Sequence, residues 1–427
     1  MGTKEKKSKT ILFYEELENV EKKFLRKCKG FKEYILNNLA LYLKKEVVFS
    51  NKLVEEIDRL SEKEERDDFS IAEYMNYSNY LDLEELIEET KEIVDVIPYS
   101  MLVSLVSSFD YFLLSMLEKI SNNKEGVARF QNTKINYEEI ESCSSLKAVK
   151  EYYIKKYLDD LFRKSHDEIF DEIKNKFNVA DIKNFSEYKK LLYVAEIRNI
   201  IVHNDGCKSV QFKNTLAKYG LKEIKIGLKF DKKGKVELPV NSILGILELL
   251  QIVSLKLFYT FIKHYFPHDE IVIEKCEMFL NHICLRRYKE NHPEIGLEIF
   301  ELLLTSAKEK DEKFMYVINK AMCMKAIGKE NYKSLIESIS WNGTANRFLI
   351  AKSLLLDDFP NALEYIKNED KREMEYIFRE WPLCRKLVKT EEFKHYYYET
   401  YGSEYKSYRK VWTATIKEYE EGKTKKV

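Results

Sequence analysis

The sequence predicts a mainly α-helical protein, and its composition and its hydrophobic pattern both support this class. Of the 427 residues only 13 are glycine and 6 are proline, so the chain is poor in the residues that form turns and interrupt helices. Apolar residues make up 44% of the chain, and over long stretches they recur at the three- and four-residue spacing of a one-sided helix. We therefore expect a helical bundle with a short β-hairpin insertion, flanked by an N-terminal helical module and a C-terminal helical-repeat-like region (an α-solenoid).

Three parts are expected along the chain, because 427 residues are too many for one small core. Residues 1–97 are predicted to form an accessory helical module, residues 98–268 the central bundle, and residues 269–427 the repeat-like region. The last assignment rests on two related stretches, 317–328 and 348–365. In each, an alanine stands in an apolar stripe ahead of a short turn and allows close helix pairing, as in tetratricopeptide-like arrays.

The N-terminal module is predicted from helical spacing that runs from Ile11 to about Leu60. The charged stretch 61–68 that follows is interpreted as a solvated linker. A further helix is expected to start at Asp82, and Pro98 is expected to end or kink it, since proline lacks the N–H of the helical ladder.

The central bundle is predicted from four helical stretches. Residues 101–120 are apolar almost all round, so this helix must lie inside the bundle. Further helices are expected at about 145–177 and 183–203. The apolar segment 242–266 is interrupted by three polar side chains, which favours a core helix over a membrane span.

The helix expected at 183–203 contains a distinctive motif at its C-terminal end. Residues 195–206 read Ala-Glu-Ile-Arg-Asn-Ile-Ile-Val-His-Asn-Asp-Gly. Arg198, Asn199 and His203 lie on its polar side, and the Asn-Asp-Gly sequence is a helix stop. At about 100° per residue, Asn199 and His203 are roughly 40° apart, so the amide is expected to steer the imidazole. Arg198 and His203 are roughly 140° apart and meet on one ligand only through long side chains, a looser last turn or a second copy of the helix.

A guanidinium beside an imidazole suits phosphodiester chemistry. Arginine neutralises phosphoryl oxygens, and histidine moves a proton to or from a ribose hydroxyl. Arg198, Asn199, three further residues and then His203, at the end of a helix in an all-helical domain, resembles the HEPN superfamily of ribonucleases. The alternative is a helix end at which Arg198 and His203 make only surface hydrogen bonds.

The resemblance implies a metal-independent endoribonuclease in which a second copy of the domain completes a homodimer. The implied chemistry is attack by the 2′-hydroxyl, which leaves a 2′,3′-cyclic phosphate and a 5′-hydroxyl end. Arg198 would bind the phosphate, His203 would act as general acid or base, and Asn199 would hold the ring. A helix C-terminus stabilises positive charge, which suits a histidine that donates a proton. Such proteins are often toxins or antiphage defence effectors, which would add a regulator or antitoxin as partner.

Two further groups of residues are candidates for the same site. Residues 107–113 resemble the first long helix of HEPN domains, where an acidic residue commonly faces the active end. Asp110 takes that place here, although a hydrogen bond to a neighbouring helix or exposure to solvent explains it equally well. Residues 223–239 alternate around a turn and predict a basic β-hairpin that either contacts an RNA backbone or is a solubilising cap. Its lysines are Lys225, Lys229, Lys232, Lys233 and Lys235.

Charge and cysteine content exclude other classes. Seventy-two basic and 72 acidic side chains give a net charge of zero, so RNA contact must be local. The seven cysteines include no Cys-x-x-Cys pair, and no metal site or cofactor is expected. An N-terminus without an apolar signal core favours a cytoplasmic protein that does not enter a membrane.

Aromatic residues crowd the C-terminal segment, where a packed cap is favoured over a stacking surface for bases. They are Tyr396, Tyr397, Tyr398, Tyr401, Tyr405, Tyr408 and Trp412. The alternative function for the whole chain is a non-catalytic helical adaptor whose C-terminal half binds a protein partner. Pairing of Arg198 and His203 with internal carboxylates would favour the adaptor.

Overall fold

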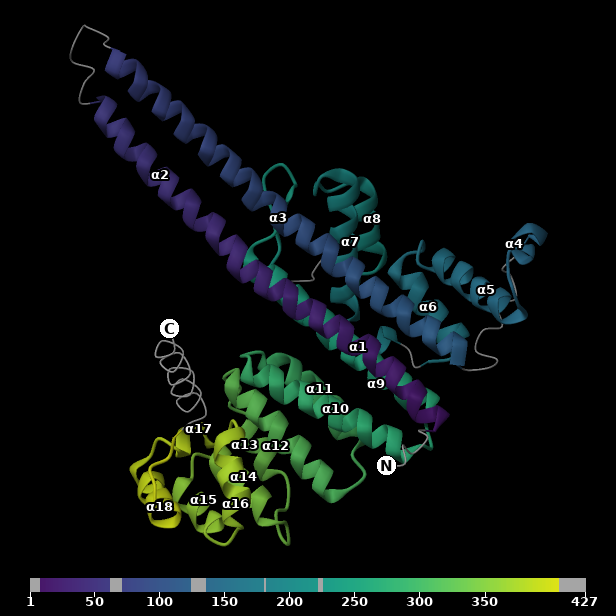
Figure 1. Cartoon of the computed structure of the whole chain (residues 1–427), viewed down its shortest axis with the longest axis vertical. Helices are drawn as coiled ribbons and strands as arrows, with labels where there is room; N and C mark the ends of the chain where they lie inside the picture. Colours follow the sequence, from purple (N-terminus) through teal and green to yellow (C-terminus); the bar gives the residue numbers. More distant parts are fainter. Residues whose placement is uncertain (1–7, 62–70, 124–135, 180–181, 222–225, 407–427) are drawn as a thin grey trace, which may run out of the picture. The chain divides into compact units, whose positions relative to one another are not determined.

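The chain folds into helices joined by short loops in the computed structural model, which describes residues 8–61, 71–123, 136–179, 182–221 and 226–406 (Figure 1). The predicted mainly α class is confirmed. The chain divides into two compact units, Met1–Cys276 and Glu277–Val427.

The first unit begins with α1 (Lys9–Tyr34), the π-helical turn η1 (Ile35–Leu39), α2 (Ala40–Ser61) and α3 (Ile71–Asn123). It continues with α4 (Tyr137–Glu141), α5 (Leu146–Leu161), α6 (His166–Lys176), the 3₁₀ turn η2 (Ile182–Asn184) and α7 (Tyr188–Asn204). It ends with α8 (Val210–Lys218), β1 (Lys229–Phe230), β2 (Val236–Glu237) and α9 (Val240–Tyr265), and α10 (Glu270–Lys289) leads into the second unit.

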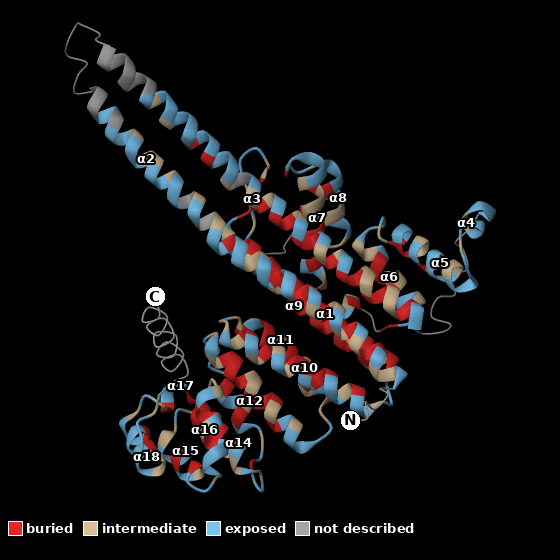
Figure 2. Cartoon of the chain, in the orientation of Figure 1, coloured by how far each residue is buried: buried red, intermediate tan, exposed pale blue. Residues whose placement is uncertain are grey.

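The core of the first unit lies between α1, α3, α7 and α9, which pack against one another. Figure 2 shows buried residues along most of α9, including Leu250, Leu255 and Phe258, which have no exposed surface. By length and composition alone, α9 and the later part of α3 are both able to cross a membrane, and 78% of the apolar window of α9 is buried within the unit. This burial is what a core helix of a bundle requires.

Helix α3 runs through Pro98 without ending, so of the two outcomes expected there, a stop or a kink, the stop is wrong. Pro98 is buried, and packing of α3 against α1 and α9 maintains the helix despite the hydrogen bond that proline removes. The division expected after residue 97 therefore falls inside one helix, and the N-terminal helices pack in the same unit as the central bundle.

Two polar contacts hold α9 in place within this core. The Ser254 hydroxyl donates to Glu21 Oε1 of α1 at 2.8 Å, and Glu21 has no exposed surface. Lys256 Nζ lies 2.8 Å from Glu187 Oε1 at the start of α7, and both side chains are at most 10% exposed. A buried pair of this kind costs about 3–5 kcal/mol when one partner is removed.

The helix predicted at 145–177 is in fact two, α5 and α6. The break follows from a capping box, in which Ser165 Oγ accepts from the Glu168 backbone and Glu168 accepts from the Ser165 backbone. The predicted hairpin is confirmed, and in its described part, residues 226–239, Lys229 is paired with Glu237 and Phe230 with Val236 as strands.

The second unit continues with α11 (Pro293–Ser306), α12 (Lys310–Ala326), α13 (Tyr332–Glu337) and α14 (Asn346–Leu355). It ends with α15 (Phe359–Ile366), α16 (Lys371–Glu380), α17 (Cys384–Leu387) and α18 (Glu391–Tyr401). Ala321 and Ala351, the small residues of the two related stretches, are buried in one cluster between α12 and α14. The two helices are therefore in contact, and their arrangement as sequence repeats stays a prediction.

The aromatic segment of α18 packs as a cap, as favoured from the sequence. Phe393 and Tyr397 are buried against Phe378 of α16, and the cluster also takes in Tyr396, Tyr401 and Tyr405. Tyr398 is exposed instead. Tyr408 and Trp412 lie outside the described residues.

Candidate active site at the C-terminal end of α7

Helix α7 carries the predicted motif and ends where the sequence placed its stop. Asp205 (φ 47°) and Gly206 (φ 76°) adopt left-handed conformations, and the Gly206 N–H donates to the Ile200 carbonyl at 3.0 Å. Residues 191–195 of the helix are all buried, and further along Ile197 and Ile200 are buried while Arg198 and Asn199 are half-buried and His203 is exposed. The buried residues of α7 are Leu191, Leu192, Tyr193, Val194, Ala195, Ile197 and Ile200. This burial anchors the helix in the core and leaves its last turn at the surface.

The hairpin fastens the end of α7. The Val236 N–H donates to the Gly206 carbonyl at 3.0 Å, and the Lys208 N–H donates to the Gly234 carbonyl at 3.0 Å. Tyr99 of α3 closes the arrangement, since its hydroxyl donates to the Val236 carbonyl at 2.6 Å. The motif helix, the hairpin and α3 thus meet at Gly206.

Replacing Gly206 with alanine is expected to destabilise the first unit by about 1–3 kcal/mol. An added Cβ would lie 2.7 Å from Tyr99 Oη and would also force alanine into positive φ. Gly220→Ala is the matched control, because Gly220 has φ +64° with only the tip of Lys189 within 4 Å. Urea unfolding should show a larger loss for Gly206→Ala, and equal losses would mean that the contact with Tyr99 is unimportant.

Arg198 is partly buried and is held by its neighbour. Its Nη1 donates to Asn199 Oδ1 at 3.1 Å. Its Nε is buried and makes no hydrogen bond within the described part of the chain. Asn199 also donates a hydrogen bond to Glu196. Burial raises the pKa of Glu196, and the nearby His166 and the hydrogen bond from Asn199 lower this pKa by a smaller amount.

His203 lies on the same helix, exposed to solvent. No hydrogen bond joins it to Asn199 or to Arg198 across the residues that the structure describes. Asn199 therefore contacts the guanidinium, because its amide oxygen accepts from the neighbouring Arg198. That Asn199 orients the imidazole stays a prediction.

Asp110 of α3 takes part in a contact that the sequence did not reveal. Its Oδ1 lies 2.8 Å from Nε2 of His166, the first residue of α6, with 24% and 14% of the two side chains exposed. The hydrogen bond to a neighbouring helix, one of the two alternatives considered for Asp110, is therefore confirmed. Through His166 and Glu196 this pair extends toward Asn199 and Arg198 of α7.

The hairpin lysines are placed beside the end of α7. Lys229, Lys232 and Lys233 are exposed, whereas Lys235 pairs with Asp205 at 3.0 Å. Lys225 lies outside the described residues. Lys235 is thus the hairpin lysine that the structure places at the end of α7, and its charge is paired with Asp205.

No cluster of three His, Cys, Asp or Glu side chains that could hold a metal ion is found among residues 8–406 where they are described. The polar side chains near the end of α7 include a guanidinium, an amide and an imidazole. A guanidinium can bind an anionic ester, and an imidazole can transfer a proton to it or from it. No protein-family model, no curated protein and no solved structure matches this chain.

Proposed function

We propose that this protein is a metal-independent endoribonuclease whose active site is formed by α7 from two copies of the chain. The proposal gives the first unit a HEPN-like role and the second unit a helical-repeat-like role in recognition or regulation. By the same resemblance the protein would act in the cytoplasm as a toxin or antiphage effector under the control of a regulator or antitoxin.

The observation that carries the proposal is the state of Arg198. Its guanidinium is fixed by Asn199, yet its Nε is buried with no partner among the described residues. A buried donor left unpaired costs about 1–3 kcal/mol, so an ordered anion at this position would be stabilised. A phosphodiester meets this need, because arginine donates to two phosphoryl oxygens at once.

The need for a second copy follows from the helix itself. Arg198 and His203 are roughly 140° apart around α7, and neither touches the other in the chain. His203 is exposed, so the imidazole is free to reach a phosphate held by Arg198 of a facing helix. A twofold pair of helices would present both sets of residues to one cleft.

The reaction would proceed by internal attack. One histidine takes the proton from the ribose 2′-hydroxyl, the 2′-oxygen forms a bond to phosphorus, and the bond from phosphorus to the 5′-oxygen breaks. The leaving 5′-oxygen takes a proton, from the second histidine in the wild-type dimer or from water where that histidine is absent, giving a 2′,3′-cyclic phosphate and a 5′-hydroxyl end. Arg198 stabilises the charge that develops on the phosphoryl oxygens.

Purified protein is expected to cut total RNA in the presence of EDTA, and His203→Ala is expected to lower the rate by about 10²–10⁴-fold. Arg198→Lys should also fail, because an ammonium does not reproduce the planar fork of donors. Sequencing of RNA ends should show cyclic phosphates and 5′-hydroxyls.

The control for this assay is His395→Ala, which removes another exposed histidine, from α18 of the second unit. It should cut RNA like the wild type. Intact RNA with the wild type, or equal cutting by wild type and His203→Ala, would reject the ribonuclease.

The second candidate is the non-catalytic adaptor, and one feature of the second unit favours it. A hollow of about 690 Å³ between α10, α12, α14 and α16 is lined largely by apolar side chains, among them Met315, Phe348 and Trp381. Apolar hollows on helical arrays commonly receive partner segments. Against it, neither Arg198 nor His203 pairs with a described carboxylate, which was the sign expected of an adaptor.

A further inference from the structure

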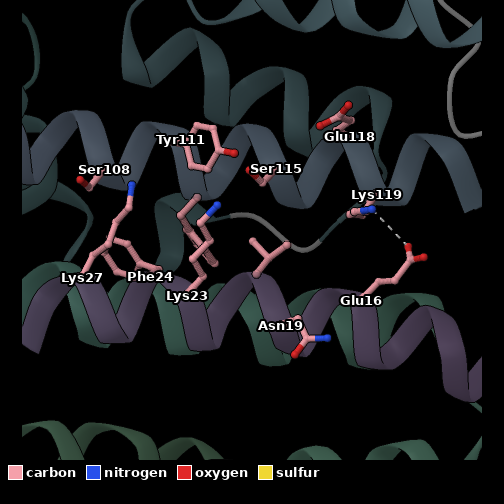
Figure 3. A pocket seen from close by; sticks show the side chains of 12 residues that line it. Glu16, Asn19, Lys23, Phe24, Lys27, Ser108, Tyr111, Ser115, Glu118 and Lys119 are labelled. Carbon is pink, nitrogen blue, oxygen red and sulfur yellow. Dashed lines mark ion pairs between the residues drawn. The ribbon is translucent and has the colours of Figure 1, made fainter.

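A pocket of about 330 Å³ lies between α1 and α3, away from the motif helix (Figure 3). Its floor is apolar, formed by Val20 and Phe24 of α1 and Phe112 of α3. Ser108 and Ser115 of α3 add hydroxyl groups along one side. The pocket therefore combines an apolar surface with hydrogen-bonding groups at its edge, which suits a flat heteroaromatic ligand.

An exposed tyrosine between two lysines is the most distinctive part of this pocket. Tyr111 is 49% exposed, and Lys23 Nζ and Lys27 Nζ lie 5.2 and 5.0 Å from the centre of its ring. Figure 3 shows both lysines rising from α1 toward α3. About half of the tyrosine surface is thus left for a stacking partner, and two positive charges lie over the ring.

Neither of these lysines is neutralised by a carboxylate among the described residues. Lys119, at the other end of the pocket, lies 3.7 Å from Glu16, and Lys22 on α1 lies 2.8 Å from Glu18. Lys23 and Lys27 lie over the Tyr111 ring and form no ion pair with a carboxylate in the described part of the chain. Two ammonium groups without counter-charges attract an anion to this end of the pocket.

We infer that the pocket binds a nucleotide unit of single-stranded RNA, with the base against Tyr111 and the backbone phosphates at Lys23 and Lys27. Aromatic stacking joined to basic backbone contacts is how proteins bind single strands with little sequence preference. The chain as a whole has no net charge, so such a local site is what RNA binding requires here.

The pocket lies on the same helix as Asp110, the α3 residue considered for the proposed active site. Tyr111 follows Asp110 directly, and Asp110 contacts His166 on the side of α3 that faces α6. Successive residues are about 100° apart around a helix, so the two features occupy neighbouring faces of α3. A strand held in the pocket would cross α3 toward α7. This step alone, and the choice of RNA over DNA, rests on the proposed function.

The test is fluorescence anisotropy with the full-length protein and a fluorescein-labelled 12-nucleotide oligouridine that is 2′-O-methylated throughout. It has no free 2′-hydroxyl within the strand, so binding is measured without cleavage. Lys23→Ala/Lys27→Ala should weaken binding at least about tenfold and reduce the slope of log K against log salt by about 1.4, the value for two lost phosphate contacts. Tyr111→Ala should weaken binding by about 5- to 150-fold, whereas Tyr111→Phe should retain it.

The matched control is Lys29→Ala/Lys32→Ala, which removes the same charge from α1 outside the pocket. It should bind like the wild type, and an equal loss in this control would overturn the inference. Competition by uridine monophosphate as strong as that by unlabelled oligonucleotide would overturn it too, since a free nucleotide would then fill the pocket. If the oligonucleotide binds through the pocket but the wild type does not cut total RNA, only the proposed ribonuclease activity is rejected. If the wild type cuts RNA but binding does not depend on the pocket residues, only this inference is rejected.

Discussion

Mixing purified Arg198→Ala and His203→Ala proteins is expected to restore RNA cleavage that neither variant shows alone. In a mixed dimer, the arginine of one copy and the histidine of the other remain intact and face the same cleft. Arg198 and His203 are roughly 140° apart around α7, so under the proposed function a pair across two copies would act on one phosphate. We expect at least about a tenfold gain over either variant, measured as initial rate on a fluorogenic RNA.

Two controls make this result decisive. The same mixing with an Arg198→Ala/His203→Ala double variant should give no gain, because no complete pair is formed. Differently tagged copies should co-purify after mixing, which shows that subunits exchange. Exchange without recovered cleavage would place each Arg–His pair within one chain and would reject the shared site.

Replacing Glu21 with glutamine is expected to stabilise the protein most at alkaline pH. Burial raises the pKa of Glu21 to about 8, against which the hydrogen bond from Ser254 has a smaller, lowering effect. The folded state therefore holds this proton more tightly than the unfolded state, whose carboxyl titrates near 4.5. Stability due to the neutral acid is complete below about pH 4.5 and falls by up to about 1.4 kcal/mol per pH unit as pH rises toward 8.

Glutamine keeps the shape of the side chain and cannot ionise, so Glu21→Gln should lose this slope. Glu21 Oε2 and Gln251 Oε1 are both buried without a partner among the described residues, and an amide keeps a donor at position 21 at every pH, whereas the carboxyl loses its donor on ionisation. Melting temperatures from pH 5 to 9 should diverge in favour of the variant. Glu33→Gln, an exposed residue of the same helix, should follow the wild type. Parallel curves for Glu21→Gln and wild type would show that Glu21 is already ionised in the fold.

The local parts of the structure were within reach of the sequence. The Asn-Asp-Gly stop after α7 and the turn of the hairpin depend on a few neighbouring residues, and both occur where expected. The break between α5 and α6 was missed although the Ser165-x-x-Glu168 capping box is legible in the chain. The helix end expected at Pro98 is absent, because the packing of the long helix α3 outweighs the effect of one proline.

Only part of the candidate site could be predicted from the sequence. Arg198, Asn199 and His203 are neighbours in sequence and were found together. Asp110 and His166 are brought together by the packing of α3 against the helices beyond it, and no spacing rule connects residues so distant along the chain. The pocket at Tyr111 was missed for the same reason, since Lys23 and Lys27 reach it from another helix.

The backbone hydrogen bonds that join Gly206 and Lys208 to the hairpin bear on how the site would work. The final turn of an exposed helix ordinarily frays, and its side chains sample many positions. Here the chain just beyond His203 is hydrogen-bonded to the hairpin, and Tyr99 forms a further hydrogen bond to the hairpin backbone. The imidazole would thus start from a preorganised backbone, and most of the ordering entropy would be lost during folding, before any substrate arrives.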